Sequence, residues 1–377
     1  MKKLKIAIVY DAIYPFVKGG TEKRNYEIAK RLVKEDLQIT IYGMQWWEGE
    51  KIRIQDGVRL YGICKPYPLY TSLGKRSIFQ AVYFALACLT LLKEDFDVLD
   101  VNHMPFFSVF SVKLITLVKG KKLYATWNEV WGKAYWREYL GRVGILAFYI
   151  EWLSARMPDV IIAVSNHTKK RLQTTLACTK EIVVIPNGVD TKLIAKTKPS
   201  SYKSDVIYAG RLLSHKHVDM LIGAIGLIKK SYPHIKCIIV GKGPQELLLK
   251  TRAKNLRLNE NIIFYDFVEF ATDLYSLFKS SKVFVFPTTR EGFGISALEA
   301  NASGIPFITT DHKDNATKEL IQEGKNGDTF RLTEIAIAQK IQKYLSVETP
   351  GSEYQKFTKN YDWDVSTKQM YQLYTNE

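Results

Sequence analysis

Short runs of aliphatic and β-branched residues alternate with amphipathic stretches along almost the whole chain. The runs cover residues 6–9, 39–42, 98–101, 122–126, 160–164 and 182–185, and then 206–209, 236–240, 262–265, 283–286 and 306–309. Helical spacing of apolar residues appears between them, for example over 22–33 and 245–256. Strands that alternate with helices are typical of parallel sheets covered on both faces. Two such series predict two doubly wound α/β domains.

The polar stretch 186–204, which contains Pro199-Ser200-Ser201, is the expected linker between these domains. A chain of 377 residues is long for one hydrophobic core and suits two. The tail 361–374 predicts an amphipathic helix, which by itself would be a core helix of the second domain. Ligands of parallel sheets bind beyond the carboxyl ends of the strands, so we expect the site in the cleft between two facing domains.

The composition excludes several classes of protein. The four cysteines show no CxxC or Cys/His pairing, which fits a reducing compartment and implies no metal site. The run 6–9 is too short for a secretory signal, and the apolar stretch 81–92 has about 12 residues where a bilayer span needs roughly 20. We expect 81–92 to be a buried helix. The protein is expected to be cytoplasmic, or at most peripheral on the inner face of the cell membrane.

The net charge of +16 predicts attraction to polyanions, meaning nucleic acid, anionic lipid or phosphorylated small molecules. A nucleic-acid-binding protein would cluster its cations on one element and carry a recognisable helix-turn-helix, RRM or OB pattern. The sequence shows none of these patterns, so we expect no nucleic-acid partner.

The loop after the run 206–209 carries two cations, Arg211 and Lys216, five residues apart before a helix that begins near Val218. A strand-end loop at a helix N-terminus favours anions, and two cations there suit a diphosphate. The alternative is a pair of solvated surface cations. After the next run, Gly241 and Gly243 permit a tight turn and a close approach to a ligand. Taken alone, an ordinary turn explains them better, and they do not form a dinucleotide fingerprint.

The segment 287–300 after the run 283–286 gives the sharpest signal. Glu291 precedes a glycine-flanked turn, and a helix is expected to begin near Ile295. Backbone N–H groups of Phe293, Gly294 and Ile295 would then point at whatever occupies the strand end. Glu299 lies one turn inside that helix, where its carboxylate could accept hydrogen bonds from ribose hydroxyls.

These three segments, in this order, resemble glycosyltransferase family 4, whose members are retaining, metal-independent nucleotide-sugar transferases with the GT-B fold. The matching pairs are Arg211 with Lys216, Gly241 with Gly243, and Glu291 with Glu299. The sequence Ile-Pro-Asn-Gly-Val-Asp at 185–190 and the pair Gly19-Gly20 near the start are supporting matches. The resemblance covers nearly the whole chain, and its most specific match is the spacing of the two glutamates.

The resemblance implies two doubly wound Rossmann-like domains facing a central cleft. Residues 1–186, with a C-terminal helix 361–377 packing back onto them, would bind the acceptor. Residues 187–360 would bind the donor, a nucleotide-sugar such as GDP- or UDP-hexose. No cofactor and no metal are implied, since two cations and a helix N-terminus would neutralise the diphosphate.

The resemblance also implies roles for individual residues. Arg211 and Lys216 would stabilise the leaving diphosphate, and Glu299 would bind the ribose. Glu291, with the backbone of Phe293, Gly294 and Ile295, would hold the sugar and phosphates. Gly19, Gly20, Gly241 and Gly243 would approach the phosphates.

The chain departs from the family on the acceptor side. The family often has a histidine just after the fourth strand, and counting without a gap places Asn102 there, with His103 one step further. His103 fills the role only after a small loop shift; its alternative is a hydrogen-bonded loop histidine. Asn128 stands at another position that is often histidine, and an asparagine orients a hydroxyl but cannot act as a general base.

The segment 124–152 is dense in aromatic residues, and residues 101–150 carry seven basic and two acidic side chains. This combination suits an interfacial helix at an anionic membrane, or a groove for a sugar or lipid. Burial of the same aromatics is the alternative. We expect a glycan or lipid-linked acceptor, with an anionic membrane surface as a further partner. A catalytically impaired sugar-binding relative and a nucleotide-sugar epimerase of the same fold are the competing functions.

Overall fold

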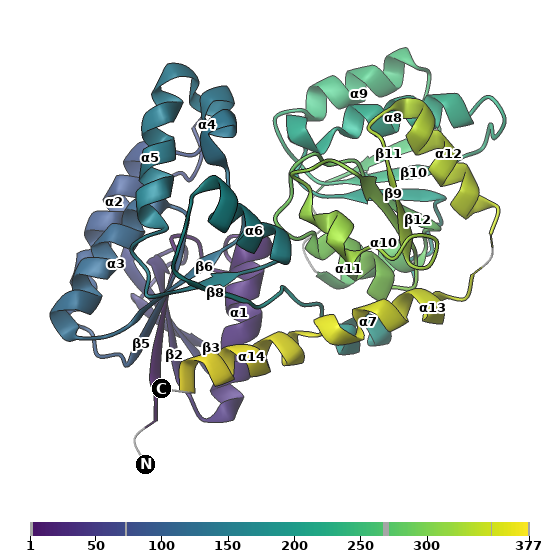
Figure 1. Cartoon of the computed structure of the whole chain (residues 1–377). Coiled ribbons are helices and arrows are strands. Elements are labelled where there is room, and N and C mark those ends of the chain that lie inside the picture. Colours follow the sequence, from purple (N-terminus) through teal and green to yellow (C-terminus); the bar gives the residue numbers. More distant parts are fainter. Residues whose placement is uncertain (1–2, 72–73, 267–270, 348, 376–377) are drawn as a thin grey trace. The chain divides into compact units, whose positions relative to one another are not determined.

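The computed structural model describes residues 3–71, 74–266, 271–347 and 349–375. Its contacts divide the chain into two compact units, each of which is described separately below (Figure 1). Unit 1 comprises Met1–Asn187 together with Trp363–Glu377, and unit 2 comprises Gly188–Asp362.

Unit 1 is built on an eight-stranded sheet with the order β3-β4-β2-β1-β5-β6-β7-β8. Its strands are β1 (Lys5–Val9), β2 (Gln38–Met44), β3 (Ile52–Gln55), β4 (Val58–Cys64), β5 (Val98–Asn102), β6 (Leu123–Trp127), β7 (Val160–Ala163) and β8 (Glu181–Val184). All neighbours pair in parallel except β3 and β4, which form an antiparallel hairpin. The six strands predicted here are confirmed, each within one or two residues, whereas the hairpin was not predicted.

Helices cover both faces of this sheet. They are α1 (Gly20–Leu32), α2 (Ile78–Cys88), α3 (Phe106–Lys119), α4 (Gly132–Leu140), α5 (Gly144–Ser154), α6 (Asn166–Thr175) and α14 (Trp363–Thr375), with short 3₁₀ turns η1 (Val33–Glu35), η2 (Leu89–Lys93) and η3 (Gly141–Val143). Side chains alternate across a strand. Ile6 and Ile8 of β1 therefore pack with α1 and α14, while Ala7 and Val9 pack with α2 and α3 (Figure 1).

Unit 2 is built on six parallel strands in the order β11-β10-β9-β12-β13-β14. The strands are β9 (Val206–Ala209), β10 (Cys237–Val240), β11 (Ile262–Tyr265), β12 (Val283–Phe286), β13 (Phe307–Thr310) and β14 (Gly327–Phe330). The helices are α7 (Thr191–Lys196), α8 (Val218–Ile228), α9 (Glu246–Asn255), α10 (Ala271–Lys279), α11 (Ile295–Ala302), α12 (Glu334–Leu345) and α13 (Gly351–Gln355), with turns η4 (Ser214–Lys216), η5 (Ala316–Leu320) and η6 (Lys356–Tyr361). Five of these strands are as predicted, and β14 is additional.

The boundary between the units falls after Asn187, inside the stretch 186–204 as expected. Two expectations about local packing are wrong. Beyond the boundary this stretch is not a linker but is attached to unit 2: Ser200 donates its N–H to the Ser276 carbonyl at 3.1 Å, and the Lys279 ammonium lies 2.7 Å from the Thr197 carbonyl. The stretch 81–92 is not fully buried either. Val82 and Leu86 of α2 are 39% and 62% exposed. Only the inward side of this helix, including Phe84, belongs to the core.

The C-terminal helix α14 packs on α1, and a buried polar network fixes its end. The Tyr374 hydroxyl donates to Asp100 Oδ2 at 2.6 Å, and the Thr126 hydroxyl donates to the same carboxylate. Burial raises the pKa of Asp100 to about 6 from its ordinary 3.8. Asp100 therefore contributes stability below about pH 4 that is lost as the pH rises through 6.

Tyr374→Phe is expected to lower the free energy of unfolding by about 1.5–3 kcal/mol at pH 8, because a hydrogen bond to an ionised buried carboxylate is lost. At pH 5 most Asp100 carboxyls are protonated, so the loss is smaller. Urea denaturation at both pH values measures the difference. Tyr371→Phe on the same helix is the control, since Tyr371 is partly exposed. An equal loss at both pH values would contradict the assignment.

Candidate functional site

The strand order reverses direction between β9 and β12 in unit 2, and between β1 and β5 in unit 1. At such a reversal the loops leaving the two central strands diverge and open a crevice at the carboxyl edge of the sheet. Most donor-side candidates follow β9, β10 and β12 of unit 2, whereas Gly19 and Gly20, which were also expected at the donor, follow β1 of unit 1. The acceptor-side candidates Asn102 and Asn128 lie at the end of β5 and just after β6. The candidates of each unit therefore lie toward the carboxyl edge of its sheet.

Lys216 and Glu291, 75 residues apart, form an ion pair in unit 2. Lys216 ends η4 and is only 8% exposed, with its ammonium 4.8 Å from the centre of the Phe286 ring. The Thr289 N–H donates to the His215 carbonyl at 3.0 Å, which joins the loop after β9 to the loop after β12. The structure thus brings together a cation expected at the diphosphate and a carboxylate expected at the sugar.

A backbone bridge holds Glu291 from its other side. Glu291 donates its N–H to the Asp314 carbonyl at 3.1 Å, and its own carbonyl accepts from Ala316 at 2.9 Å. The loop after β13 therefore also meets the predicted donor site, which the sequence did not indicate. Arg211 lies in the exposed loop after β9, and its carbonyl accepts the Tyr208 hydroxyl at 3.0 Å.

Gly241 and Gly243 let two loops of unit 2 pack together. A Cβ atom on Gly241 would lie 2.0 Å from the Gly210 carbonyl oxygen, and one on Gly243 would lie 2.3 Å from the Leu212 carbonyl oxygen. Leu212 in turn donates its N–H to the Lys242 carbonyl at 2.9 Å. The glycines are therefore required by the fold whatever their role toward a ligand.

The helix α11 begins at Ile295, as predicted, directly after the glycine turn. Gly294 has φ +99°, a left-handed conformation that favours glycine, and a Cβ there would lie 2.4 Å from the Thr317 hydroxyl. The Phe293 side chain is buried against Tyr361, so only its backbone remains for a ligand. The first amides of α11 lack partners within the helix, as at any helix start.

Glu299 is buried on α11, and its carboxylate accepts the Tyr275 hydroxyl of α10 at 3.1 Å. Tyr275 therefore orients the carboxylate that is expected to meet the ribose. His217 was not predicted: its Nε2 lies 3.1 Å from the Thr289 hydroxyl, and burial lowers its pKa. The motif His215-Lys216-His217 could have pointed to it in the sequence.

Amide side chains meet at the carboxyl edge of unit 1. Gly19 and Gly20 lead into α1, whose residue Asn25 accepts a hydrogen bond from the Asn102 amide at 3.2 Å. Asn128 donates to Asn102 at 3.4 Å. Asn102 and Asn128, the two acceptor-side candidates, are therefore in contact.

His103 lies on the opposite side of β5 from Asn102, within an aromatic cluster. Its ring stacks on Trp127 with centroids 4.9 Å apart and meets the edge of Phe106 at 5.6 Å. Burial lowers the pKa of His103 to about 4, so the imidazole is neutral at physiological pH. Its buried Nε2 has no hydrogen-bond partner among the described residues.

A buried carboxylate near this edge was not predicted from the sequence. Asp11, fully buried just after β1, accepts hydrogen bonds from Arg76 at 2.7 Å and from Gln80 of α2 at 2.8 Å. These two hydrogen bonds connect the start of α2 to the segment that follows β1. An acidic residue directly after the first strand was the available signal.

Several aromatic side chains of the segment 124–152 pack into the core of unit 1. Trp127, Trp131 and Trp136 are buried, and Tyr149 is the exposed member, at 56%. Buried Glu151 accepts hydrogen bonds from the Trp131 and Gly132 N–H groups and from the Trp136 ring, at 2.7, 2.9 and 2.8 Å. Burial raises the pKa of Glu151 to about 7. The burial alternative is therefore correct for these three tryptophans, while Tyr135, Tyr139, Phe148 and Trp152 pack against the same core and stay partly exposed.

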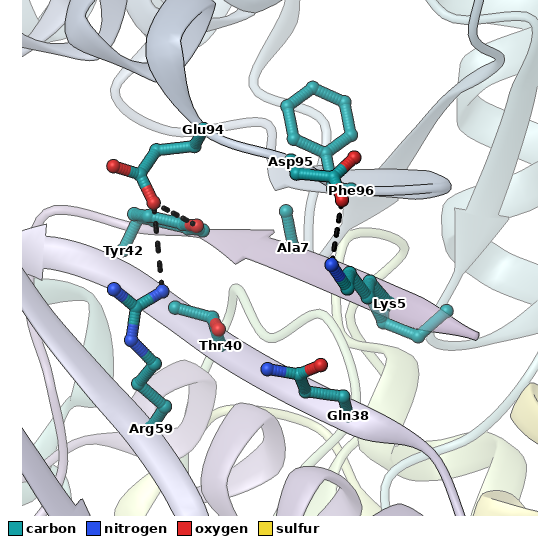
Figure 2. Close-up of a pocket in the computed structure, with 10 residues that line it drawn as sticks. Lys5, Ala7, Gln38, Thr40, Tyr42, Arg59, Glu94, Asp95 and Phe96 are labelled. Carbon is teal, nitrogen blue, oxygen red and sulfur yellow. Dashed lines mark hydrogen bonds and ion pairs between the residues drawn. The ribbon is translucent and has the colours of Figure 1, made fainter. Parts of the chain in front are cut away.

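A cavity of about 140 Å³ in unit 1 lies toward the amino ends of β1 and β2, away from the predicted site (Figure 2). Its charges are already paired: Lys5 with Asp95 at 2.6 Å, and Glu94 with Arg59 at 3.6 Å. The Tyr42 hydroxyl also donates to Glu94 at 3.1 Å. Nothing in this arrangement suits a phosphorylated ligand.

Neither metal clusters nor spanning helices are found in the part of the chain that the structure describes. It contains no group of three or more His, Cys, Asp or Glu side chains arranged to hold a metal ion. Within the same residues, no helix combines the length and apolarity needed to cross a membrane.

Known families match the chain in two adjacent segments. The sequence model described as Glycosyltransferase Family 4 matches residues 18–193, and the one described as Glycosyl transferases group 1 matches residues 189–362.

Individual proteins are similar to the chain at low sequence identity. Putative glycosyltransferase EpsD of Bacillus subtilis is 28% identical over 209 residues, 51% of this chain and 53% of that protein. A phosphatidylinositol N-acetylglucosaminyltransferase component from Arabidopsis thaliana is 23% identical over 319 residues, 82% of this chain and 67% of that protein. The matched regions thus span about half to two thirds of these relatives.

A structure of HepE from Anabaena in complex with UDP and glucose has a similar fold, with a TM-score of 0.75 and 17% sequence identity. The similarity covers 99% of this chain and 100% of that one. The family matches and the two parallel sheets confirm the resemblance seen in the sequence: over residues 18–362 the chain is similar to glycosyltransferases of family 4, and it has the GT-B fold.

Proposed function

We propose that the chain transfers a hexose from GDP- or UDP-hexose to an acceptor hydroxyl, with retention of configuration and without a metal ion. The observation that carries this proposal is the Lys216–Glu291 pair at the strand reversal of unit 2, beside the start of α11. A diphosphate binds to a cation and to the N-terminus of a helix, and the attached sugar needs a group, here a carboxylate, that accepts hydrogen bonds from its hydroxyls.

The pairing in the ligand-free protein gives Lys216 a defined position. An ammonium group has three N–H donors, and the ion pair with Glu291 occupies one direction. The remaining donors can bind a diphosphate oxygen while Glu291 keeps the ammonium in place. The second carboxylate oxygen of Glu291 can accept a hydrogen bond from a sugar hydroxyl. One pair thus serves both the leaving group and the sugar.

Charge stabilisation of the leaving diphosphate is the main catalytic contribution in this scheme. Arg211 and Lys216 supply two positive charges, and the amides of Gly294 and Ile295 add the dipole of α11. Glu299 receives the ribose hydroxyls, oriented by Tyr275. The acceptor hydroxyl attacks from the face that the diphosphate leaves, which retains the configuration. HepE, which has a similar fold, was solved with UDP and glucose, in keeping with a nucleotide donor.

Neutral groups of unit 1 receive the acceptor hydroxyl. Asn102 and Asn128 can orient it by hydrogen bonds, and His103 is uncharged at physiological pH. We propose a lipid-linked or membrane-surface glycan as acceptor, at the inner face of the cell membrane. The Arabidopsis relative, whose name specifies phosphatidylinositol, supports a lipid acceptor.

Thermal-shift measurements against a library of nucleotide-sugars test the donor assignment. A true donor at a hundredfold excess over its Kd stabilises the folded protein by about 2.7 kcal/mol. Stabilisation by one nucleotide-sugar, followed by transfer to an acceptor extract, is the expected result. Donor conversion without any acceptor would instead identify an epimerase, and binding without transfer across a broad acceptor panel would identify an impaired relative.

Arg211→Ala and Lys216→Ala are each expected to lower kcat by roughly 10²–10³, because each removes a positive charge from the leaving diphosphate. Lys282→Ala is the matched control. Lys282 lies just before β12, at the amino edge of the same sheet, and pairs with Asp205 at 2.9 Å. Unchanged kcat in both site variants would remove the donor-site assignment.

Glu299→Ala is expected to raise the donor KM at least tenfold with a smaller change in kcat, because the ribose contact is lost in the ground state as well as in the transition state. Tyr275→Phe keeps the carboxylate and removes only its hydroxyl donor, so its KM should change less. Steady-state kinetics with varied donor measure both. A kcat effect alone in Glu299→Ala would contradict a binding role.

Activity is expected to survive EDTA, because Arg211, Lys216 and the helix start supply the positive charge that a metal ion would otherwise provide. Initial rates are compared before and after dialysis against the chelator. Complete loss that added Mg²⁺ or Mn²⁺ restores would exclude the metal-independent mechanism.

A further inference from the structure

Three neighbouring helices of unit 1 expose large apolar side chains. The helices α2, α3 and α5 lie on the same face of the sheet, with α3 in contact with both others (Figure 1). Six of their side chains are at least 60% exposed: Ile78, Phe79 and Leu86 on α2, Leu117 and Val118 on α3, and Leu146 on α5. We call the outward side of these three helices the apolar face.

The outward side of a surface helix is normally polar, and the apolar face departs from that rule. The helix α2 has no charged residue, α3 has only Lys113 and Lys119, and the one charged residue of α5, Glu151, is fully buried. Large contiguous apolar patches on soluble proteins mark interaction sites. No acidic side chain of these three helices reaches solvent.

The surroundings of the apolar face are basic. Lys93 ends η2, Lys133 and Arg137 lie on α4, and Arg142 lies in η3 between α4 and α5; all four are exposed. Two exposed acids lie among them, Glu138 on α4 and Asp95 just after η2, which pairs with Lys5, so the four cations remain in excess. Since α4 packs on α5, and η2 packs on α3, these cations border the apolar face. An apolar centre with a basic border complements the acyl chains and phosphates of an anionic bilayer.

The three helices are too short to cross a bilayer, so they would bind to its surface. The longest of the three, α3, has 14 residues, about 21 Å of helix against the roughly 30 Å of a hydrocarbon core. A second copy of this chain would bring the same cations against one another, on a protein whose net charge is +16. Charge therefore favours an anionic lipid surface over self-association.

We infer that the apolar face of α2, α3 and α5 docks unit 1 onto the surface of an anionic bilayer. This inference rests on the proposed function, because it explains how the chain reaches a lipid-linked acceptor. This face, with its basic border, overlaps the segment 124–152 that the sequence suggested, because α4, η3 and most of α5 belong to that segment, and it extends onto α2 and α3. The cations at the border select anionic over neutral lipid.

Co-sedimentation with vesicles tests the inference. The full chain is incubated with vesicles of phosphatidylcholine alone or mixed with phosphatidylglycerol. The test variant combines Leu86→Gln, Leu117→Gln and Leu146→Gln, all at exposed positions. The matched control combines Leu247→Gln, Leu248→Gln and Ile335→Gln on α9 and α12 of unit 2, which are 77%, 64% and 63% exposed. Both variants change three exposed apolar residues to glutamine.

The expected result is binding of the wild type to anionic vesicles, at least tenfold weaker binding of the test variant, and unchanged binding of the control. Arg137→Gln with Arg142→Gln should weaken binding to anionic vesicles several-fold, since each cation near such a surface contributes about 1 kcal/mol, or fivefold. Absence of vesicle binding by the wild type, or equal loss in test and control variants, would overturn the inference. Concentration-dependent dimerisation that the test variant abolishes would instead assign the face to self-association.

Donor-dependent thermal shifts without vesicles separate this inference from the proposed function. The test variant should retain the full shift, because none of its positions belongs to the donor site. A wild type that binds the donor but not vesicles refutes only the docking. A wild type that binds vesicles but neither binds nor transfers a nucleotide-sugar refutes only the proposed function.

Discussion

Parallel pairing of β9 with both β10 and β12 is the constraint on which the donor side depends. Parallel strands point their carboxyl ends to one edge, so the loops that leave them must meet there. This geometry joins Lys216 to Glu291 across 75 residues of sequence and packs Gly241 against Gly210. The same arrangement places the start of α11 beside the ion pair. A break in this pairing would separate the candidates that follow β9 from those that follow β10 or β12.

The sequence predicts those parts of the fold that bury apolar residues on both faces of a sheet. Every predicted strand is present, because an interior parallel strand needs a continuous apolar run. The hairpin β3–β4 escaped because β3 is mostly exposed and carries alternating polar residues. Its turn at Asp56-Gly57, both with positive φ, was the usable signal. The strand β14, with the sequence Gly-Asp-Thr-Phe, offers too little apolar pattern to be recognised.

The candidate site was predictable as a set of residues but not as a set of contacts. Motif spacing identifies Lys216 and Glu291, whereas only the tertiary fold shows that they pair. The sequence also did not show which apolar side chains are buried and which are exposed. A helix such as α2 that is apolar on every side gives no periodicity from which to tell its buried side from its exposed side. For the same reason the buried tryptophans around Glu151 and the exposed leucines of α2 and α3 could not be distinguished in advance.

The two carboxyl edges differ in chemistry, and the difference matches the two substrates of a transferase. The edge of unit 2 combines a buried ammonium, a carboxylate and a helix start, a set suited to a diphosphate with a sugar attached. The edge of unit 1 instead gathers the amides of Asn25, Asn102 and Asn128 next to a neutral His103. Amides both donate and accept hydrogen bonds, so they suit an uncharged hydroxyl rather than a phosphate. Because burial keeps His103 neutral, this side chain adds no positive charge that would compete for the diphosphate. The proposed division of donor and acceptor between the two units therefore rests on the charge state of the side chains at their strand ends.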